Sequence, residues 1–531
     1  MASLLIKNIG LLQTPIGSFS HRGEKQAENI KLKNAAILVK DGIIHEITSD
    51  GVLPHGEADA DKVVDAGGCL VTPGLVDGHT HMVFGGYRQN EIPLKLRGAS
   101  YLDILRAGGG IMDTVRKTRA ASFEQLYQKT KGFLDEMMSL GVTSCEAKSG
   151  YGLDFETEIK MLKVLNQLEK EHVMDIVPTF MAAHAVEECW KGKEEEYIRI
   201  CCDEMMPYVK EHNLAEYVDI FTEDSVFNVE QSKVYLEKAK QLGFKLRIHA
   251  DEIEAIGGSV LAGEMEAVSA EHLIVINDDG MKAMAESKTT AMCLPATSFY
   301  LNAGFAPVRR MIDEFEIPVA LASDFNPGSC PSLNLQFVMN LGCLKYKMLP
   351  EEVLTAVTVN PACAIGKEKT IGTLEEGKQA DMVIWNADDM EMLCYRFGSN
   401  LVNTVINYLD VLASDAPAPG GGSVSALSAA QGAGLVMMVC DLTIPKEKYL
   451  KYKDLCVEVR EEISSTYDKL IEAVDKDTEA FNRVSAAFKL PKDDEEQKAK
   501  RSEAIQEATV LATEVPYETM EFCICGLETT A

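Results

Sequence analysis

The chain contains no long hydrophobic run and little basic charge. No stretch of its 531 residues reaches the roughly 18 consecutive apolar residues of a membrane-spanning helix. The first residues, MASLLIKNIG, hold a short apolar run without a cleavage-type segment, so we expect neither a signal peptide nor a membrane partner. Lys and Arg total 52 against 82 Asp and Glu, which gives a formal net charge of −30. Because nucleic acids and anionic membranes bind basic surfaces, we expect neither as a partner, and an anionic substrate needs a local cation.

Structural cysteine spacing, internal repeats and a dinucleotide fingerprint are also lacking. The 14 cysteines, which include the adjacent Cys201 and Cys202, follow neither a disulfide nor a zinc-ribbon spacing. We therefore expect reduced thiols in a cytoplasmic protein. No glycine fingerprint for a dinucleotide follows the first strand of the α/β region. What the chain does have is length and 46% hydrophobic residues, enough for a large domain and a second one.

Apolar strands alternate with amphipathic helices over residues 71–365. Helical spacing of apolar residues marks FETEIKMLKVLNQLEKEH and VEQSKVYLEKAKQLG, and Ser122 with Gln125 fits a capping box that opens a helix ending near Leu140. The strands that we expect between such helices are GVTSCEAK, DIVPTFMAAH, FKLRIHA, AEHLIVI, TTAMCLP and IPVALASD. Repeated strand-helix units predict an α/β fold, a TIM-like (β/α)8 barrel, with an open doubly wound sheet as the alternative.

Short β segments flank this region, and a helical segment follows them. Residues 1–70 hold alternating runs between turn signals, and the β pattern returns in residues 366–406. We expect the two segments to form one small composite β-sandwich that the barrel interrupts. Residues 407–423 contain SDAPAPGGGS and predict a linker. Residues 424–531 predict an all-α C-terminal segment.

The sequence GLVDGHTHMVF carries the first candidate site. Its apolar run ends in two histidines, His79 and His81, and side chains at positions i and i+2 of an extended strand point to the same face. Neutral imidazole is a common ligand of zinc and similar ions. Two ordinary histidines at a polar strand end are the simpler interpretation of this motif taken alone.

Five of the ten histidines fall at ends of expected strands, namely His79, His81, His184, His249 and His272. Asp324 ends another strand, and the carboxyl ends of barrel strands meet at one mouth. Three imidazoles and one carboxylate form a plausible mononuclear site with an open position for water. A metal there lowers the pKa of bound water to about 7 and polarises a carbonyl, which favours hydrolysis. Glu252 either reaches the reacting groups or favours a helix N-terminus, and His272 is either a proton carrier or a core residue.

The motifs DGHTH, HADE, EH, SDFNPGS and G-x-L-x-x-G-K-x-A-D-x-V-x-W (Gly372 to Trp385) together resemble the amidohydrolase superfamily and, within it, the imidazolonepropionase family. The resemblance covers residues 1 to about 406 and includes FGGYRQNE, AGGGI, AKSGYGLD, TFMAAHA and PATSFYL. It implies a distorted barrel with a composite β-sandwich. It also implies hydrolytic ring opening of the small anion 4-imidazolone-5-propanoate to N-formimidoyl-L-glutamate, a step of histidine degradation.

The resemblance implies one zinc or iron ion and a set of roles for individual residues. The metal ligands are His79, His81, His249 and Asp324. The implied substrate contacts are Arg88, Tyr151, His184, Glu252, Asn326, Gly328 and Ser329, with Arg88 suited to bind the propionate bidentately. We expect Asp324, aided by His272, to receive the proton of the attacking water, and Glu252 to serve the ring nitrogen; which of the three is the principal base stays open. The alternatives are a purine or pyrimidine aminohydrolase with the same metal residues and a metal-binding scaffold without turnover.

The chain departs from the imidazolonepropionase pattern after NLVNTVI, where a closing strand is expected to be lost. The segments NYLDVLASDAPAPGGGSVSALSAAQGAG and DKDTEAFNRVSAAFKLPK resemble the cyclodeaminase or cyclohydrolase domain of formimidoyltransferase-cyclodeaminase, and we expect this domain to stop early, at Ala531. Such domains are helical, dimerise, and convert 5-formimidoyl-tetrahydrofolate to 5,10-methenyl-tetrahydrofolate. The tail is therefore an active folate enzyme, a dimerisation module or a remnant. Asp477 is its candidate acid-base group, and Gly420 to Gly422 form either an anion-binding turn or a linker.

Overall fold

The computed structural model describes residues 3–55, 60–98, 109–406, parts of 433–444, 447–488, 490 and 495–530. Contacts divide the chain into two compact units, Met1–Tyr408 and Leu409–Ala531, which are described separately below. The expected finer segment boundaries within these units stay predictions. Among the described helices, none has both the length and the apolar character needed to cross a bilayer.

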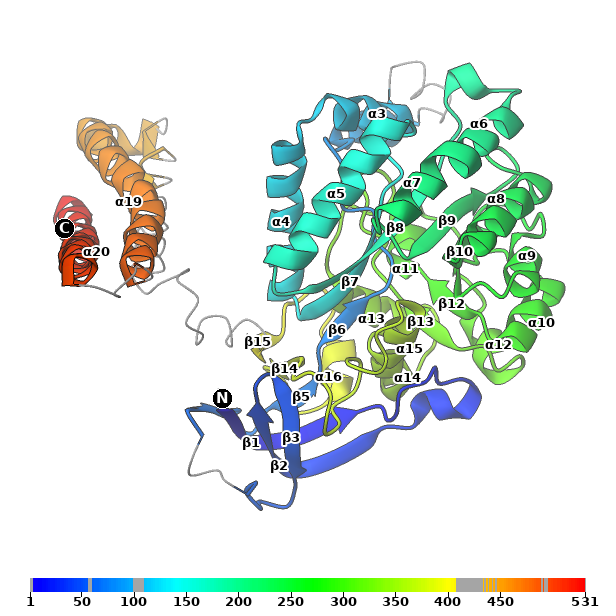
Figure 1. Cartoon of the computed structure of the whole chain (residues 1–531), viewed down its shortest axis with the longest axis horizontal. Coiled ribbons are helices and arrows are strands. Elements are labelled where there is room, and N and C mark those ends of the chain that lie inside the picture. The colour runs from blue at the N-terminus through cyan, green and yellow to red at the C-terminus, as the bar shows by residue number, and fades with distance from the viewer. Residues whose placement is uncertain are drawn as a thin grey trace. The chain divides into compact units, whose positions relative to one another are not determined.

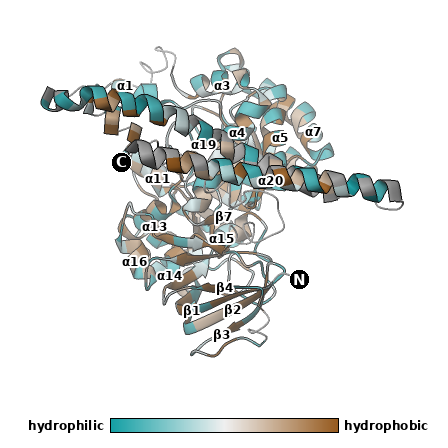
Figure 2. Ribbon diagram, turned by 90° about the vertical axis from the view of Figure 1, so that its left-hand side faces the viewer, coloured by the Kyte–Doolittle hydropathy of each residue, from teal (hydrophilic) through white to brown (hydrophobic). Residues whose placement is uncertain are grey.

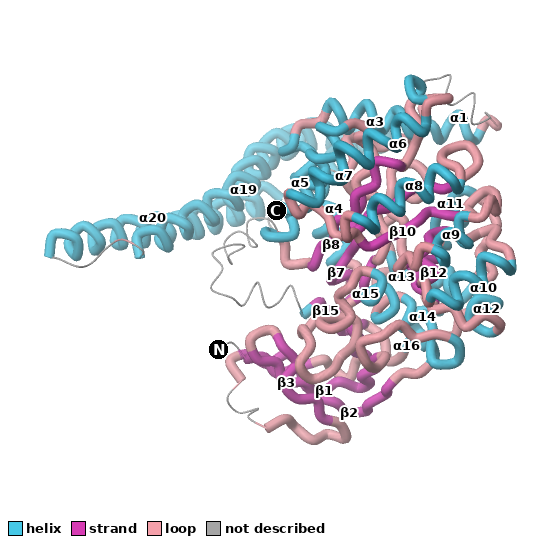
Figure 3. The backbone as a smooth tube through the Cα atoms, turned by 45° about the vertical axis from the view of Figure 1, so that its right-hand side comes forward, coloured by secondary structure: helices cyan, strands magenta, loops and turns pink. Residues whose placement is uncertain are grey.

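Eight parallel strands form the centre of the first unit, each hydrogen-bonded to the next in chain order, with helices outside them (Figures 1 and 3). The strands are β6 (Leu75–Asp77), β7 (Val142–Lys148), β8 (Asp175–Ala183), β9 (Tyr217–Thr222), β10 (Lys245–Ala250), β11 (Ser269–His272), β12 (Thr290–Cys293) and β13 (Val319–Leu321). The first and last strands meet just beyond their ends, because Thr80 pairs with Phe325 and the Asp324 amide donates to the His79 carbonyl at 3.1 Å. The predicted (β/α)8 barrel is confirmed, and this closure excludes the open sheet.

Amphipathic helices cover the barrel strands where the apolar spacing predicted them. Helix α4 (Phe123–Ser139) begins with the expected capping box, in which the Ser122 hydroxyl accepts from the Gln125 amide at 3.1 Å and the Gln125 side chain accepts from the Ser122 amide at 2.9 Å. Further helices of this layer are α3 (Ile111–Ala120), α5 (Phe155–Glu171), α8 (Val229–Gln241), α9 (Gly258–Glu264), α10 (Asp278–Ser287), α11 (Pro295–Leu301), α12 (Val308–Asp313), α13 (Leu335–Leu344), α14 (Pro350–Ala356) and α15 (Val359–Ala364). Their buried apolar faces and the strands share one large core.

A seven-stranded sheet joins the N-terminal and post-barrel segments, as the composite β interpretation predicted. Its order is β15 (Val402–Val405), β14 (Met382–Trp385), β5 (Leu70–Pro73), β1 (Ser3–Thr14), β2 (Ile30–Lys40) and β3 (Ile43–Thr48), and β4 (Lys62–Asp65) pairs with β1. Brown, hydrophobic stretches are visible along β1 and β2 in Figure 2. Trp385 is fully buried at the junction, where its indole N–H donates to the Thr72 hydroxyl at 2.9 Å.

Two differences from the expected barrel strands bear on the site. Strand β9, with the sequence YVDIFT, was not among the strands we expected, and it contributes Asp219 to the barrel interior. The expected strand AEHLIVI ends at His272, because His272 and Leu273 adopt left-handed φ angles of 68° and 60° that break the extended conformation. Apolar periodicity reports neither a strand that contains a buried aspartate nor a left-handed backbone conformation.

The second unit consists of helices in the part that the structure describes, which confirms the predicted all-α segment. Helices α19 (Lys453–Phe488) and α20 (Glu495–Thr530) pack together, with Ile463 and Leu470 of α19 near Phe522 of α20. Asp477 falls on α19, but its side chain lies outside the described set. The predicted linker, including Gly420 to Gly422, and the place of the closing strand after NLVNTVI also lie outside the described residues.

Candidate active site

Four of the predicted metal ligands meet at the carboxyl end of the barrel. His79 and His81 follow β6, His249 lies on β10, and Asp324 follows β13. The Nε2 atoms of His249 and His81 are 3.3 Å apart, and Asp324 Oδ1 lies 3.6 Å from His79 Nε2 and 3.7 Å from His81 Nε2. One ligand atom from each of the three histidines lies within 4.8 Å of the others. The closure of the barrel between β6 and β13 is what brings the two ends of this set together.

The protonation of the histidines suits a cation. His79 Nδ1 donates to Glu271 Oε2 and His249 Nδ1 donates to Asp219 Oδ1, each at 3.0 Å, so each ring turns its Nε2 atom toward the centre. Burial lowers the pKa of His79 and of His81 well below the usual value, which keeps both rings neutral. Buried His79 Nε2 has no hydrogen-bond partner among the described residues. Lone pairs that face one another across this space are the donor set that a divalent cation requires.

A buried ion network supports the two carboxylates that orient the histidines. Lys148 Nζ lies 2.8 Å from both Asp219 Oδ2 and Glu146 Oε1, and Arg247 lies 3.5 Å from Glu271. All five side chains are fully buried. Burial raises the pKa of Glu271 to about 7, whereas for Asp219 the nearby His249 and Lys148 outweigh burial and hold its pKa below the usual range. The network therefore keeps Asp219 ionised as the hydrogen-bond acceptor of His249.

Sequence reasoning missed this network, although a signal for part of it was present. Glu146 and Lys148 alternate within the apolar strand GVTSCEAK, and Arg247 lies in FKLRIHA, so charged side chains at two-residue spacing pointed to a polar barrel interior. Asp219 was hidden because its strand was not recognised.

Substitution of Asp219 by Asn should weaken metal binding by about 10- to 100-fold, the usual effect of losing a carboxylate behind a ligating histidine. The amide keeps the volume of Asp219 but removes the charge that fixes the His249 tautomer. Metal affinity measured by competition with a chromophoric chelator checks the effect, and Glu352→Gln, which changes a buried carboxylate of α14 that pairs with Arg309, should bind metal as the wild type does. An Asp219→Asn affinity within twofold of the wild type would show that Asp219 does not position His249.

The remaining predicted residues surround the same point. A cavity of about 130 Å³ lies beside the cluster of His79, His81 and His249. It is lined by His81, Arg88, Ile111, Tyr151, His184, Phe221, His249, Glu252, His272, Asp324, Asn326 and Ser329. Of the predicted substrate contacts, only Gly328 is not part of this lining. It packs directly against the Arg88 guanidinium.

Two carboxyl groups in the cavity are suited to proton transfer near neutral pH, whereas burial lowers the pKa of the neighbouring His272 well below its usual value. Burial raises the pKa of Asp324 to about 7, while the Thr297 hydroxyl donates to its Oδ2 at 2.6 Å. Burial and the neighbouring Asp324 raise the pKa of Glu252 to about 7. His272 Nε2 lies 3.7 Å from Glu252 Oε2. A general acid or base works best when its pKa lies near the working pH, so each of the two carboxyl groups meets that requirement.

Arg88 presents a cation to the cavity. Its Nε atom is buried and has no hydrogen-bond partner among the described residues. Glu91 Oε1 lies 3.9 Å from this Nε atom, which is too far for a hydrogen bond. The same Glu91 oxygen accepts a hydrogen bond from the Gly110 amide at 2.7 Å. A β-carbon at Gly328 would lie 1.0 Å from Arg88 Nη2, so only glycine lets the guanidinium lie there. Asn326 Oδ1 holds this loop by accepting from the Gly328 and Ser329 amides at 2.8 and 2.7 Å. The site therefore offers a guanidinium to an anionic group of a ligand.

Two further carboxylates hold the loops that carry Tyr151 and Glu252. Glu158 accepts from the Gly150, Gly152 and Leu153 amides at 2.7 to 3.0 Å, which fixes the turn around Tyr151. Glu223 accepts from the Ile253 and Glu254 amides at 2.9 and 3.1 Å, next to Glu252. Sequence reasoning missed both, because their partners are backbone amides and leave no side-chain motif. His184 stacks on His81, with ring centroids 4.7 Å apart, and its Nδ1 donates to the Gly150 carbonyl.

Comparison with known proteins agrees with this arrangement. The sequence model of the Amidohydrolase family matches residues 70–411, and that of the Formiminotransferase-cyclodeaminase family matches residues 404–531. The imidazolonepropionase of Alkaliphilus metalliredigens (strain QYMF) is 49% identical over 416 residues, covering 76% of this chain and 97% of that relative. The imidazolonepropionase of Bacillus thuringiensis (strain Al Hakam) is 50% identical over 376 residues, covering 70% of this chain and 88% of that relative.

Solved structures share the fold at low identity. An adenosine deaminase from Xanthomonas campestris with bound zinc superimposes with a TM-score of 0.56 at 18% identity, covering 76% of this chain and 91% of that one. Escherichia coli guanine deaminase gives a TM-score of 0.55 at 13% identity, covering 72% and 88%. These likenesses establish the barrel architecture alone, whereas the relatives near 50% identity establish the family. The chain belongs to the imidazolonepropionase family of the amidohydrolase superfamily and carries a C-terminal segment that matches the formiminotransferase-cyclodeaminase family.

Proposed function

We propose that the barrel unit hydrolyses the ring amide of 4-imidazolone-5-propanoate and releases N-formimidoyl-L-glutamate, a step of histidine degradation, with one zinc or iron ion bound. The observation that carries the proposal is the position of Arg88. Its guanidinium faces the same cavity as the three-histidine cluster and has a buried Nε without a partner among the described residues. An imidazolone with a propionate side chain supplies both the cyclic amide and the carboxylate that these two features require.

The chemistry divides among the side chains as follows. A divalent ion held by His79, His81, His249 and Asp324 would activate water and polarise the ring carbonyl. Arg88 binds the propionate bidentately, and Tyr151 and His184 contact the substrate from the same cavity lining. Water adds across the ring C–N bond, so its oxygen ends on the carbonyl carbon and one of its protons on the departing nitrogen.

Asp324 receives the water proton, and the Thr297 hydroxyl, which donates to its Oδ2 at 2.6 Å, orients the carboxyl group. His272, 3.7 Å from Glu252, assists the movement of the proton. Glu252 hydrogen-bonds the ring nitrogen and delivers the proton as the C–N bond breaks; its pKa of about 7 allows it to hold a proton beforehand.

Turnover of imidazolone propionate by the purified full chain, followed by the loss of its ultraviolet absorbance, tests the proposal. Metal-depleted protein should be inactive and should recover on addition of one equivalent of zinc or iron, which also decides between the two ions. A purine or pyrimidine aminohydrolase would instead deaminate neutral bases and ignore imidazolone propionate. A scaffold would bind one metal ion tightly and hydrolyse neither, and either of these results would refute the proposed reaction.

We infer that the C-terminal unit acts on a tetrahydrofolate carrying the formimino group and that the chain forms a homodimer in the cytoplasm. The family match over residues 404–531 supports the folate substrate, and Asp477 on α19 is its proposed acid-base residue. Large apolar side chains stay exposed on the two helices, including Leu455, Tyr517 and Met520, and support association of two copies. The described cysteines are all free, as expected of a reducing compartment.

The full chain should therefore sediment as a dimer and form 5,10-methenyl-tetrahydrofolate from the 5-formimidoyl compound, whereas a chain ending at Tyr408 should lose that turnover and keep ring opening. If the full chain is monomeric and does not turn over the folate compound, the C-terminal unit is a remnant without the proposed activity.

A further inference from the structure

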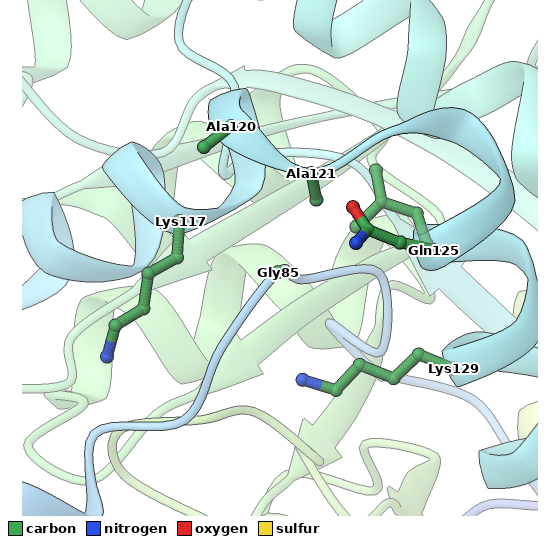
Figure 4. Close-up of a pocket in the computed structure, with 7 residues that line it drawn as sticks. Gly85, Lys117, Ala120, Ala121, Gln125 and Lys129 are labelled. Carbon is green, nitrogen blue, oxygen red and sulfur yellow. The ribbon is translucent and has the colours of Figure 1, made fainter.

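A second cavity shares no lining residue with the active-site cavity and includes Gly85, from the segment that carries Arg88. It has a volume of about 390 Å³ and is lined by Gly85, Lys117, Ala120, Ala121, Gln125, Leu126 and Lys129. Figure 4 shows Gly85 between the Lys117 and Lys129 side chains, with the Gln125 amide across from the Lys129 ammonium. Two lysines and no carboxylate line this space, which is unusual in a chain with a net charge of −30.

The two ammonium groups differ in their partners. Lys117 Nζ lies 2.8 Å from Asp113 Oδ2 and donates to the Tyr87 carbonyl at 2.8 Å, so its charge is balanced. Lys129 Nζ has no ion pair with any described acidic residue and rests instead on aromatic faces, 4.4 Å from the Phe84 ring centroid and 4.7 Å from that of Tyr87. Ring faces orient a cation but do not neutralise it, so Lys129 remains a half-buried charge without a counterion in the described residues.

Small residues line the same cavity. Gly85 packs against α3 so closely that a β-carbon there would lie 2.2 Å from the Lys117 carbonyl oxygen, and Ala120 and Ala121 contribute only methyl side chains to the lining. The Gln125 Oε1 atom is held by the Ser122 amide, which leaves its Nε2 group as a donor. An ammonium and a side-chain amide therefore bound a space that is large enough for a small oxyanion.

We propose that the Lys117–Lys129 cavity is a binding site for a small dianionic oxyanion, held mainly by the Lys129 ammonium and by the Gln125 amide. The ligand is recognised as a tetrahedral oxyanion or as a small dicarboxylate, and it binds separately from the substrate of the barrel. It contacts the back of the segment Phe84 to Arg88, whose other face serves the active-site cavity through Arg88.

The charge state of Lys129 makes the site sensitive to pH. Burial, and then the charge of Lys117, lower the pKa of Lys129 to about 8. The titratable groups that face it in the described residues are the Lys117 ammonium of α3, with its partner Asp113, and the Tyr87 phenol of the preceding segment. A lysine needs its proton to bind an anion, so affinity is full below about pH 7 and falls about tenfold by pH 9.

Calorimetric titration of the metal-loaded full chain with sulfate and, separately, with glutarate tests the site, since both probes stay dianionic from pH 7 to pH 9. We expect binding that weakens about tenfold or more in Lys129→Met, because one charge-assisted contact is lost. Lys129→Arg should bind without the loss between pH 7 and pH 9. Lys131→Met, on the same helix, is the matched control and should bind as the wild type does. Arg88→Met should also retain binding, because the substrate site is separate.

The location is checked by soaking crystals in selenate, which should place a selenium peak within about 4 Å of Lys129 Nζ, since a selenate oxygen accepts from the ammonium at about 2.8 Å. Binding of sulfate alone assigns a tetrahedral oxyanion, and binding of glutarate alone assigns a dicarboxylate; either supports the site. Equal affinities in the wild type and in folded Lys129→Met, or loss of binding in Arg88→Met alone, would overturn it, because the anion would then occupy the substrate site.

Discussion

Replacement of His249 by Ala should abolish both metal retention and ring opening, with activity reduced by about 10³-fold or more. His249 supplies one of three imidazoles around the cation position and is the only one of them on β10. Its loss also leaves the buried Asp219 carboxylate, which accepts from His249 at 3.0 Å, without that donor. A bound ion stabilises the charge that develops in the transition state by several kcal/mol. Because about 1.4 kcal/mol corresponds to a factor of ten in rate, we expect the rate to fall by at least about three orders of magnitude.

Metal content by plasma emission spectrometry and turnover at saturating substrate measure this effect together. His212→Ala is the matched control, since His212 is exposed and its side chain contacts the carbonyl and the ring of Tyr208. It should keep one metal ion and full activity. Retained turnover in a folded, metal-free His249→Ala protein would refute the assignment of the site.

Replacement of Arg88 by Met should lower kcat/KM by about 10²- to 10³-fold while leaving metal content unchanged. Each hydrogen bond to a charged group contributes about 1.5–3 kcal/mol, and a bidentate guanidinium makes two of them. The propionate does not change during ring opening, so the lost interaction is about equal in the ground and transition states. The effect should therefore appear mainly as a higher KM.

Steady-state kinetics separate KM from kcat, and two further variants sharpen the test. Arg88→Lys keeps the charge without the fork geometry and should recover only part of the loss. Arg310→Met removes a surface arginine, paired with Asp278 and Glu314, and should change neither constant. A KM unchanged in Arg88→Met would show that the guanidinium does not bind the substrate carboxylate.

Much of the fold was predictable because it depends on local patterns. The capping box at Ser122 and Gln125 and the apolar spacing of α5 and α8 report helices directly. The two-residue spacing of His79 and His81 placed both rings on one side even though β6 itself ends at Asp77, since the extended path continues to the bridge at Thr80. Patterns of this kind depend on neighbours in the chain, which the sequence contains.

What was not predictable depends on partners far apart in the chain. The role of Asp219 depends on its contacts with Lys148 and His249, which are distant in the sequence. Its strand, YVDIFT, shows neither a clear apolar-polar alternation nor a continuous apolar run. Glu223 and Glu158 act on backbone amides, so nothing in their own segments marks them. The early end of the strand at His272 comes from a left-handed φ angle that no residue type announces.

The claim on which the account depends is that one divalent cation is held jointly by His249 on β10 and by side chains that follow β6 and β13. Anomalous diffraction from a crystal of the metal-loaded full chain tests it most directly. We predict one strong peak about 2.0–2.2 Å from the Nε2 atoms of His79, His81 and His249 and from a carboxylate oxygen of Asp324. A single peak elsewhere, or a peak bound by the first two histidines with His249 and Asp324 out of reach, would contradict it.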